Sequence, residues 1–218
     1  MEGSSLRLLR LLHLADSALP IGGMAHSFGI ETLAAEGSLN VERLPQFLED
    51  YVAEAGAMDA AFCRAAHALA GPAFSEEKWL DLNRRRSALQ PSRESRAASA
   101  TLGRRFLELA SGLGDWPWLV QALPDAHHST AFGLAGGALG LDVEATVLAW
   151  LHQSVAGLVS ACQRLLPLGQ RQAGRILWDL KPALARAAKN SDEVFCFTAA
   201  LDLASMRHPS LATRLFIS

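Results

Sequence analysis

The chain contains few of the residue types that build metal centres and disulfides. Its 218 residues include only three cysteines, Cys63, Cys162 and Cys196, which lie far apart in apolar sequence and form no Cys-x-x-Cys or Cys/His ligand spacing. Because a free cysteine behaves as a small hydrophobic side chain, we expect free, buried thiols in a reducing compartment. The sequence therefore predicts no metal site.

Catalytic sequence patterns are also missing. The Gly22-Gly23 pair does not extend to a Walker loop, and no strand-GxGxxG-helix unit is present. Neither a GxSxG elbow nor an HExxH pattern occurs. We therefore predict a protein that is not an enzyme, with no catalytic and no cofactor-binding residues. The alternative is a helical enzyme with its site between His26, Glu31 and His67, for which the sequence offers no nucleophile.

Neither sign of charge dominates the chain. The formal net charge is -2 at pH 7, 19% of the residues are charged and 50% are hydrophobic, as in ordinary globular proteins. Seventeen of the twenty basic residues are arginines, and seven of these lie between residues 84 and 105. We interpret this stretch as a solvated helix surface with local ion pairs. The alternative is a helical nucleic-acid-binding protein that uses the Arg84–Arg105 region on phosphates, but no nucleic-acid-binding module accompanies it.

The sequence has no clear targeting or membrane-spanning segment. Residues 145–163 are uncharged over nearly the length of a membrane span, but three polar residues, 152–154, fall at the middle, where polar side chains cost most. We expect a buried helix there. Near the N-terminus, Arg7 and Arg10 interrupt a leucine-rich stretch, which makes it a poor match to a signal peptide. These features predict a cytoplasmic protein that does not contact membranes.

Apolar residues recur at spacings of three and four along nearly the whole chain, and no strand-like alternation is present. We therefore predict an all-α fold, a single-domain bundle of about eight to ten helices over residues 1–218. Ser75, Ser92 and Asp142 are predicted helix N-caps. The expected helices span residues 41–70, 76–89, 92–112, a short stretch ending near Leu123, 125–140, 142–166, 171–189 with a bend at Pro182, and 192–206.

The remaining histidines do not form a ligand pattern. His127 and His128 are adjacent, and adjacent positions on a helix point about 100° apart, so one helix does not aim both at one ion without help. We interpret them as surface or capping residues, and leave open whether they bind a metal. His26 and His67 are interpreted as structural side chains whose hydrogen bonds are satisfied within the fold.

One segment does not fit a plain amphipathic helix. Residues 14–31, LADSALPIGGMAHSFGIE, combine a proline, three glycines, two acids and a histidine. Such a segment is typical of an active-site loop, a phosphate cradle or a corner between two helices that a partner contacts. Asp16 is interpreted here as a helix cap, whereas a capping role and a partner-binding role both stay open for Glu31.

This segment is one of four that resemble the urease accessory protein UreF family. In the first, the matching positions are Asp16, Pro20, Gly22, Gly23, His26, Ser27, Gly29 and Glu31. The others are Glu94–Ser99 with Gly103, Arg164–Gln170, and Ser205–His208 with Arg214–Phe216. Each segment alone is a weak signal, and the resemblance rests on their order along residues 14–216.

The resemblance implies an all-α homodimer that acts as a chaperone-like adaptor and has no reaction of its own. In that family the protein bridges UreD, called UreH in some organisms, and the GTPase UreG. The resulting complex docks on apo-urease and helps to insert nickel into its metallocentre, and the adaptor modulates GTP hydrolysis by UreG. No cofactor is implied for the adaptor itself.

Nine residues in the matched segments are predicted to bind partners. They are Gly29, Glu31, Arg164, Pro167, Gly169, Gln170, Arg214, Leu215 and Phe216. The last three belong to residues 207–218, which carry no helical pattern and are predicted to form a C-terminal partner-binding tail. Apolar side chains gathered at a chain end mark a binding surface, and an arginine beside them supplies an anchor. The alternative is that the tail folds back on the protein's own dimer.

Overall fold

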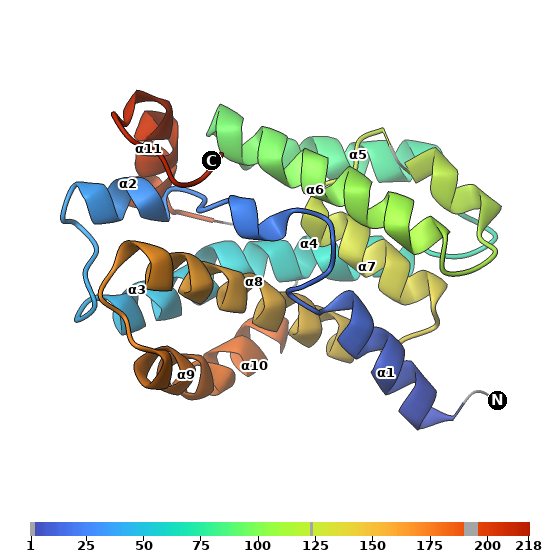
Figure 1. Ribbon diagram of the computed structural model, residues 1–218. Helices are drawn as coiled ribbons and strands as arrows, with labels where there is room; N and C mark the ends of the chain where they lie inside the picture. Colours follow the sequence, from blue (N-terminus) through green and yellow to red (C-terminus); the bar gives the residue numbers. More distant parts are fainter. Residues whose placement is uncertain (1–2, 123, 190–195) are drawn as a thin grey trace.

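Helices make up the regular structure of the chain (Figure 1). In chain order the α-helices are α1 (Ser4–Leu14), α2 (Ile30–Ala35), α3 (Leu44–Tyr51), α4 (Ala57–Ala68), α5 (Glu76–Ala88), α6 (Arg93–Ser111), α7 (His128–Ala138), α8 (Val143–Leu165), α9 (Gln170–Asp179), α10 (Lys181–Lys189) and α11 (Ala199–Arg207). Short 3-10 helices cover Gly23–Ala25, Pro117–Ala122 and His208–Ser210, and a π-helical turn covers Val52–Gly56. This computed structural model describes residues 3–122, 124–189 and 196–218, which contain no strand. The all-α prediction is confirmed.

Helices α4, α7 and α8 form the centre of the molecule. All three pack against one another, α6 covers α7, and α10 lies against α4 and α8 (Figure 1). The largest fully buried side chains include Phe62, Phe106 and Phe132, which come from α4, α6 and α7. The apolar faces predicted from the spacing of three and four therefore meet in one core.

The three predicted N-caps are confirmed. Ser75 Oγ accepts the backbone N–H of Lys78 at 3.3 Å, and Asp142 Oδ1 accepts that of Ala145 at 2.8 Å. Ser92 Oγ plays the same role at the start of α6. A side-chain cap contributes about 1 kcal/mol because it satisfies an N–H that has no partner in the helix.

Several predicted boundaries differ from those in the structure. The helix expected over 41–70 is one helical run in which the π-helical turn separates α3 from α4. The helix expected over 171–189 is instead two helices, α9 and α10, and the break falls at Leu180. Pro182 does not bend a helix but lies in the first turn of α10, where backbone N–H groups have no intrahelical partner.

Two further boundaries concern α7 and α11. Helix α7 begins at His128 rather than near residue 125. Helix α11 ends at Arg207, close to the predicted end at residue 206. Its predicted start at residue 192 lies outside the described residues, and so does Leu123, the predicted end of the short helix before α7.

The arginine-rich stretch contributes to the interior as well as to the surface. Arg86 donates from Nε to Asp59 Oδ1 at 2.7 Å, and both residues are buried. Arg96 donates to the Gln90 carbonyl at 2.6 Å, and Arg105 contacts the opening segment rather than solvent alone. Arg86 and Arg96 thus differ from the predicted solvated surface. The other five arginines are exposed, and Arg104 forms a local ion pair with Glu108, as predicted.

Helix α8 has the length and hydropathy of a membrane-spanning helix, with a mean hydropathy of 1.3 over its most apolar stretch. Half of that stretch is buried inside the protein, including Val147, Leu151 and Val155. The helix packs against α4, α7 and α10, so it is a core helix, as the sequence predicts.

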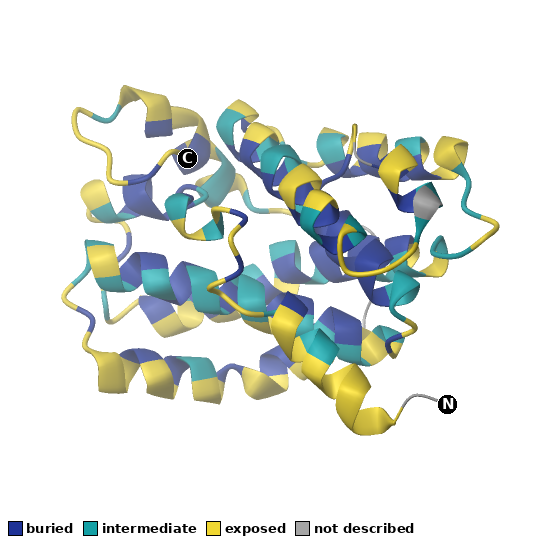
Figure 2. Ribbon diagram, turned by 45° about the vertical axis from the view of Figure 1, so that its right-hand side comes forward, coloured by how far each residue is buried: buried dark blue, intermediate teal, exposed yellow. Residues whose placement is uncertain are grey.

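Helix α1 contrasts with the rest. Leu8, Leu9 and Leu12 are each more than half exposed, and only Leu14 at its end is fully buried. Figure 2 shows this helix exposed along most of its length. Its leucine face is thus an apolar surface of the described chain.

Close packing between α4 and α7 depends on Gly133. A Cβ at this position would overlap the backbone carbonyl of Cys63. We expect Gly133→Ala to lower the free energy of unfolding by about 1–3 kcal/mol, the usual cost of overpacking a core. In the matched control Gly174→Ala, on α9, a Cβ has open space, and alanine should raise stability by up to about 1 kcal/mol through helix propensity. Urea unfolding followed by circular dichroism measures both, and equal effects would contradict the close contact.

Candidate functional site

The opening segment, residues 14–31, turns sharply between α1 and α2. Asp16 Oδ1 accepts the backbone N–H of Ala18 at 2.8 Å, so Asp16 stabilises a turn after α1 and is not the helix cap that was predicted. Phe28 and Gly29 follow with φ of 51° and 94°, in the left-handed region. A Cβ on Gly29 would also overlap Ser205 Oγ on α11. Glycine is therefore required here both by the backbone angle and by the close approach of α11.

The C-terminal tail, residues 207–218, lies against the opening segment (Figure 1). The Ile217 N–H donates to the Ala25 carbonyl at 2.8 Å. The Ser218 carbonyl accepts the Ser27 hydroxyl at 3.0 Å and the Ser27 backbone N–H. The tail thus folds back on its own chain and is held chiefly through its backbone.

The carboxylate of Glu31 holds the middle of the tail. Its Oε1 accepts the Leu215 N–H at 2.6 Å, and its Oε2 accepts the Phe216 N–H at 3.2 Å and contacts His208 Nε2 at 2.9 Å. Glu31 is only 4% exposed. Burial by itself raises the pKa of Glu31, but these three hydrogen bonds together outweigh it and lower the pKa below the ordinary value. The ionised carboxylate is therefore the form that binds the tail.

His208 connects Glu31 to a second carboxylate. It is fully buried, and its Nδ1 lies 2.7 Å from Glu94 Oε2. A neutral imidazole has one N–H and satisfies only one carboxylate, whereas an imidazolium donates to both. Arg214 Nη1 also contacts Glu94, at 3.4 Å. Two carboxylates, His208 and Arg214 thus join the start of the tail, its end and the start of α6.

Arg164, at the end of α8, fixes Phe216. Its guanidinium lies 4.2 Å from the centre of the Phe216 ring, and its Nη1 donates to the Met24 carbonyl at 3.0 Å. Phe216 is 5% exposed. The phenyl ring is therefore covered by this chain itself, and the stacked arginine adds a cation–π contact.

Lowering the pH tests the Glu31 contacts. Because the pKa of Glu31 is lowered on folding from its ordinary 4.5, its contribution to stability is present above pH 4.5 and is lost as the pH falls through the folded-state pKa. We expect the difference in unfolding free energy between wild type and Glu31→Gln to shrink as the pH is lowered from neutral through this range. Urea titrations at a series of pH values measure it. A difference that stays constant at acid pH would mean that the charge of Glu31 does not hold the tail.

The turn between α8 and α9 holds three more of the predicted binding residues, Pro167, Gly169 and Gln170, and all three are exposed. Gly169 has φ of -73° and ψ of 155°, and a Cβ there would meet nothing. The turn itself therefore does not require glycine. A role for this turn in partner binding stays a prediction.

Three exposed apolar side chains lie on the docked tail and on the opening segment next to it. Met24, Leu215 and Ile217 are 43%, 58% and 67% exposed. The hydrogen bond between Ile217 and Ala25 places Ile217 next to the Met24 backbone. We call these three residues the tail surface. It leaves apolar side chains in solvent although the backbone beneath them is bound.

Sequence reasoning assigned no role to two of the residues that fasten the tail, Glu94 and His208. Glu94 and His208 belong to matched segments, yet they are 114 positions apart and nothing in the sequence pairs them. The structural roles predicted for His26 and His67 are confirmed, because His26 Nδ1 lies 2.8 Å from Ser218 Oγ and His67 contacts the Leu141 carbonyl at 3.0 Å.

Of the two roles predicted for His127 and His128, surface or capping, the surface position is wrong, since His127 is buried and His128 is half-buried. His127 is 4% exposed, lies at the N-cap position of α7 and contacts Ser99 Oγ at 3.0 Å. Burial lowers the pKa of both imidazoles to about 4. Over the described ranges, no group of three or more His, Cys, Asp and Glu side chains is placed to hold a metal ion.

Comparison with known proteins identifies the family. The family model described as UreF matches residues 39–181. A protein named urease accessory protein UreF from Corynebacterium glutamicum (strain R) is 34% identical, over 95% of this chain and 96% of its own length. Proteins of the same name from Actinobacillus pleuropneumoniae serotype 5b and Nostoc sp. are 33% and 32% identical, over 95% and 96% of this chain and 97% and 95% of their own lengths. These matches give no support to the nucleic-acid-binding alternative. The chain therefore belongs to the UreF family of urease accessory proteins.

Proposed function

We propose that this protein is a cytoplasmic adaptor in urease maturation that bridges UreD (UreH) and the GTPase UreG. As a homodimer it brings both to apo-urease, helps to insert nickel into the metallocentre and modulates GTP hydrolysis by UreG. The names of its relatives support a role beside urease rather than a reaction of its own. The observation that carries the proposal is the docked tail with its outward apolar side chains.

The tail surface has the properties of a protein-binding site. Hydrogen bonds to their backbone N–H groups hold Leu215 and Ile217 in place, so the backbone of this segment loses little further conformational freedom on binding a partner. Arg214 is exposed beside them, and its contact with Glu94 holds it in position. A preorganised apolar patch next to an arginine is the usual composition of an interface centre. We assign this surface to UreD.

The turn between α8 and α9 provides a second contact for the same assembly. Pro167, Gly169 and Gln170 are exposed just beyond the end of α8, and Arg164 links that end to Met24 of the tail surface. The turn and the tail surface are therefore joined through one helix end. Gly29 and Glu31 act indirectly in this account, since they position the tail rather than contact the partner.

Substitution of the tail surface tests the proposal. In Leu215→Ser/Ile217→Ser the side chains are replaced while the backbone contacts to Glu31 and Ala25 are kept. We expect its affinity for the host's UreD to fall on the order of thirtyfold, the effect of losing about 2 kcal/mol of interface energy. The matched control is Leu8→Ser/Leu9→Ser, which removes two equally exposed leucines from α1.

Hydrogen exchange at the Leu215 and Phe216 amides shows whether the tail of the variant is still docked. If the tail stays docked and UreD binds as tightly as it does to wild type, the assignment of this surface to UreD is wrong. If the α1 control loses UreD and the tail variant does not, UreD binds the leucine face of α1 instead of the tail surface.

A further inference from the structure

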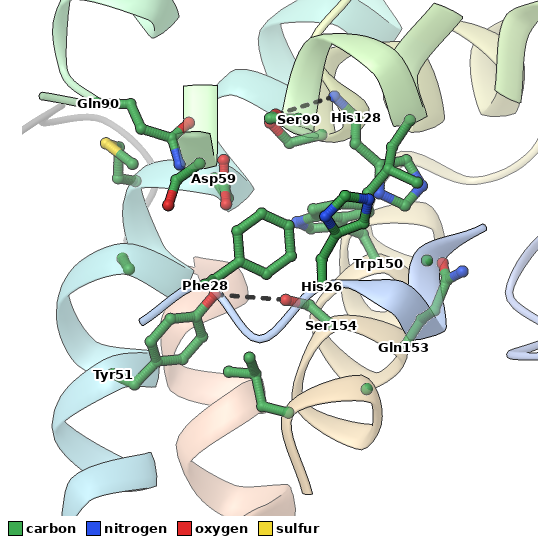
Figure 3. A pocket seen from close by; sticks show the side chains of 18 of the residues that line it. His26, Phe28, Tyr51, Asp59, Gln90, Ser99, His128, Trp150, Gln153 and Ser154 are labelled. Atoms are coloured by element: carbon green, nitrogen blue, oxygen red, sulfur yellow. Dashed lines mark hydrogen bonds between the residues drawn. The ribbon is translucent and has the colours of Figure 1, made fainter. Parts of the chain in front are cut away.

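A cavity that shares only Met24 with the tail surface lies among α4, α6, α7, α8, α11 and the opening segment (Figure 3). Its volume is about 150 Å³, enough for several water molecules or one small organic molecule. Figure 3 shows His26 and Phe28 entering it from the opening segment, with Trp150 and Ser154 coming from α8 and Asp59 from α4.

The backbone beside this cavity is irregular. The π-helical turn Val52–Gly56 borders it through Ala55, and Tyr51, just before the turn, donates or accepts a hydrogen bond at 3.5 Å with Ser154. A π-helical turn is rare and is frequently found at functional sites. This local departure from α-helix places Tyr51 and Ala55 on the cavity wall.

Five buried polar side-chain atoms that have no hydrogen-bond partner within the described chain belong to residues that line the cavity. They are Ser95 Oγ, His128 Nε2, Ser129 Oγ, Trp150 Nε1 and Gln153 Oε1. Only two other buried side-chain atoms in the described ranges share this property, and neither of their residues lines the cavity. Each unpartnered group costs about 1–3 kcal/mol, and folded proteins pair nearly all of them. Their concentration at one cavity indicates an occupant that forms hydrogen bonds with them.

The charged side chains on the cavity wall are negative on balance. Asp16, Asp59 and Asp202 belong to the wall together with one cation, Arg86, which pairs with Asp59 at 2.7 Å. Burial lowers the pKa of His128 to about 4, so its imidazole is neutral. An anion entering the cavity would lose its hydration without gaining a counter-charge, and a metal cation offers no acceptor to the Trp150 N–H. The cavity therefore favours an uncharged occupant.

The donors and acceptors specify the occupant further. The indole N–H of Trp150 only donates, so it requires an acceptor, and Gln153 Oε1 requires a donor. The Ser95 and Ser129 hydroxyls do either. We propose that this cavity binds a small uncharged molecule that carries both a carbonyl oxygen and an N–H group, of the primary carboxamide type. This proposal does not rest on the assignment of the tail surface to UreD.

Three probes of nearly the same shape test it: acetamide, acetone and acetate. Acetone lacks the N–H donor and acetate carries a charge, so each removes one required property. The indole N–H signals of the whole chain are followed by proton–nitrogen NMR, and Trp150→Phe assigns the signal of Trp150. We expect acetamide to shift this signal saturably and to leave that of Trp178 unmoved, since Trp178 is 71% exposed on α9. Acetone and acetate should bind at least about tenfold more weakly, the effect of one unsatisfied hydrogen bond.

Gln153→Leu gives a second measurement, with an expected rise of about tenfold in the Kd for acetamide. The wild-type titrations need no variant, so a misfolded variant leaves the test intact. The proposal is overturned if no probe shifts the Trp150 signal saturably, which would mean that the cavity holds water only. Equal binding of acetone, or preferential binding of acetate, would overturn it as well.

Discussion

Replacing Glu31 with glutamine is expected to detach the C-terminal tail and to lower the free energy of unfolding by about 3 kcal/mol. Glutamine keeps one acceptor oxygen, but it removes the charge opposite His208 and turns an NH2 group toward the tail amides. A buried donor left without its acceptor costs about 1–3 kcal/mol, and the Leu215 amide, the Phe216 amide and His208 all lose the carboxylate. Urea unfolding gives the stability, and hydrogen exchange at the Leu215 and Phe216 amides reports whether the tail has detached.

Glu36→Gln is the matched control. Glu36 also binds a residue of the tail, since Arg207 contacts its carboxylate at 2.7 Å, but this pair is exposed to solvent. Exposed ion pairs contribute little to stability, so the stability and the protection of the tail amides should stay close to those of wild type. Protected tail amides in Glu31→Gln would show that the carboxylate is not what holds the tail.

Replacing Arg86 with methionine is expected to destabilise the protein by about 3–5 kcal/mol. Arg86 and Asp59 are 4% and 8% exposed and lie 2.7 Å apart, so methionine leaves a carboxylate buried without its partner. Thermal or urea unfolding measures the loss.

The double variant Asp59→Leu/Arg86→Met separates the charge from the packing. Because both charges are then absent, most of the lost stability should return. Arg175→Met removes an exposed pair with Asp179, 2.8 Å apart, and should change stability little. A double variant as unstable as Arg86→Met would mean that the volume of the side chains matters more than their charges.

Much of the fold was predictable from local sequence. Helix starts at Ser75, Ser92 and Asp142 follow from side chains that satisfy nearby N–H groups, which is a property of four successive residues. The break at Leu180 was not predictable in this way. Proline is tolerated in the first turn of a helix as well as at a bend, so Pro182 fits both one bent helix and two helices.

The candidate site was predictable only in part. The opening segment and the tail were both singled out by sequence, and the structure brings Gly29, Glu31 and Phe216 together. Their mode of contact was not predictable, because the Glu31 carboxylate binds tail backbone N–H groups, which every residue type except proline presents. The pairing of Glu94 with His208 depends on how distant helices pack, which local patterns do not determine.

The most direct test of the adaptor role is co-purification of this chain with its host's UreD and UreG, comparing wild type with a chain that ends at Met206. We predict that wild type forms a complex containing both partners and that the shortened chain loses UreD, because the tail surface is gone. Wild type that binds neither partner, under conditions in which each is folded, would contradict the proposed function.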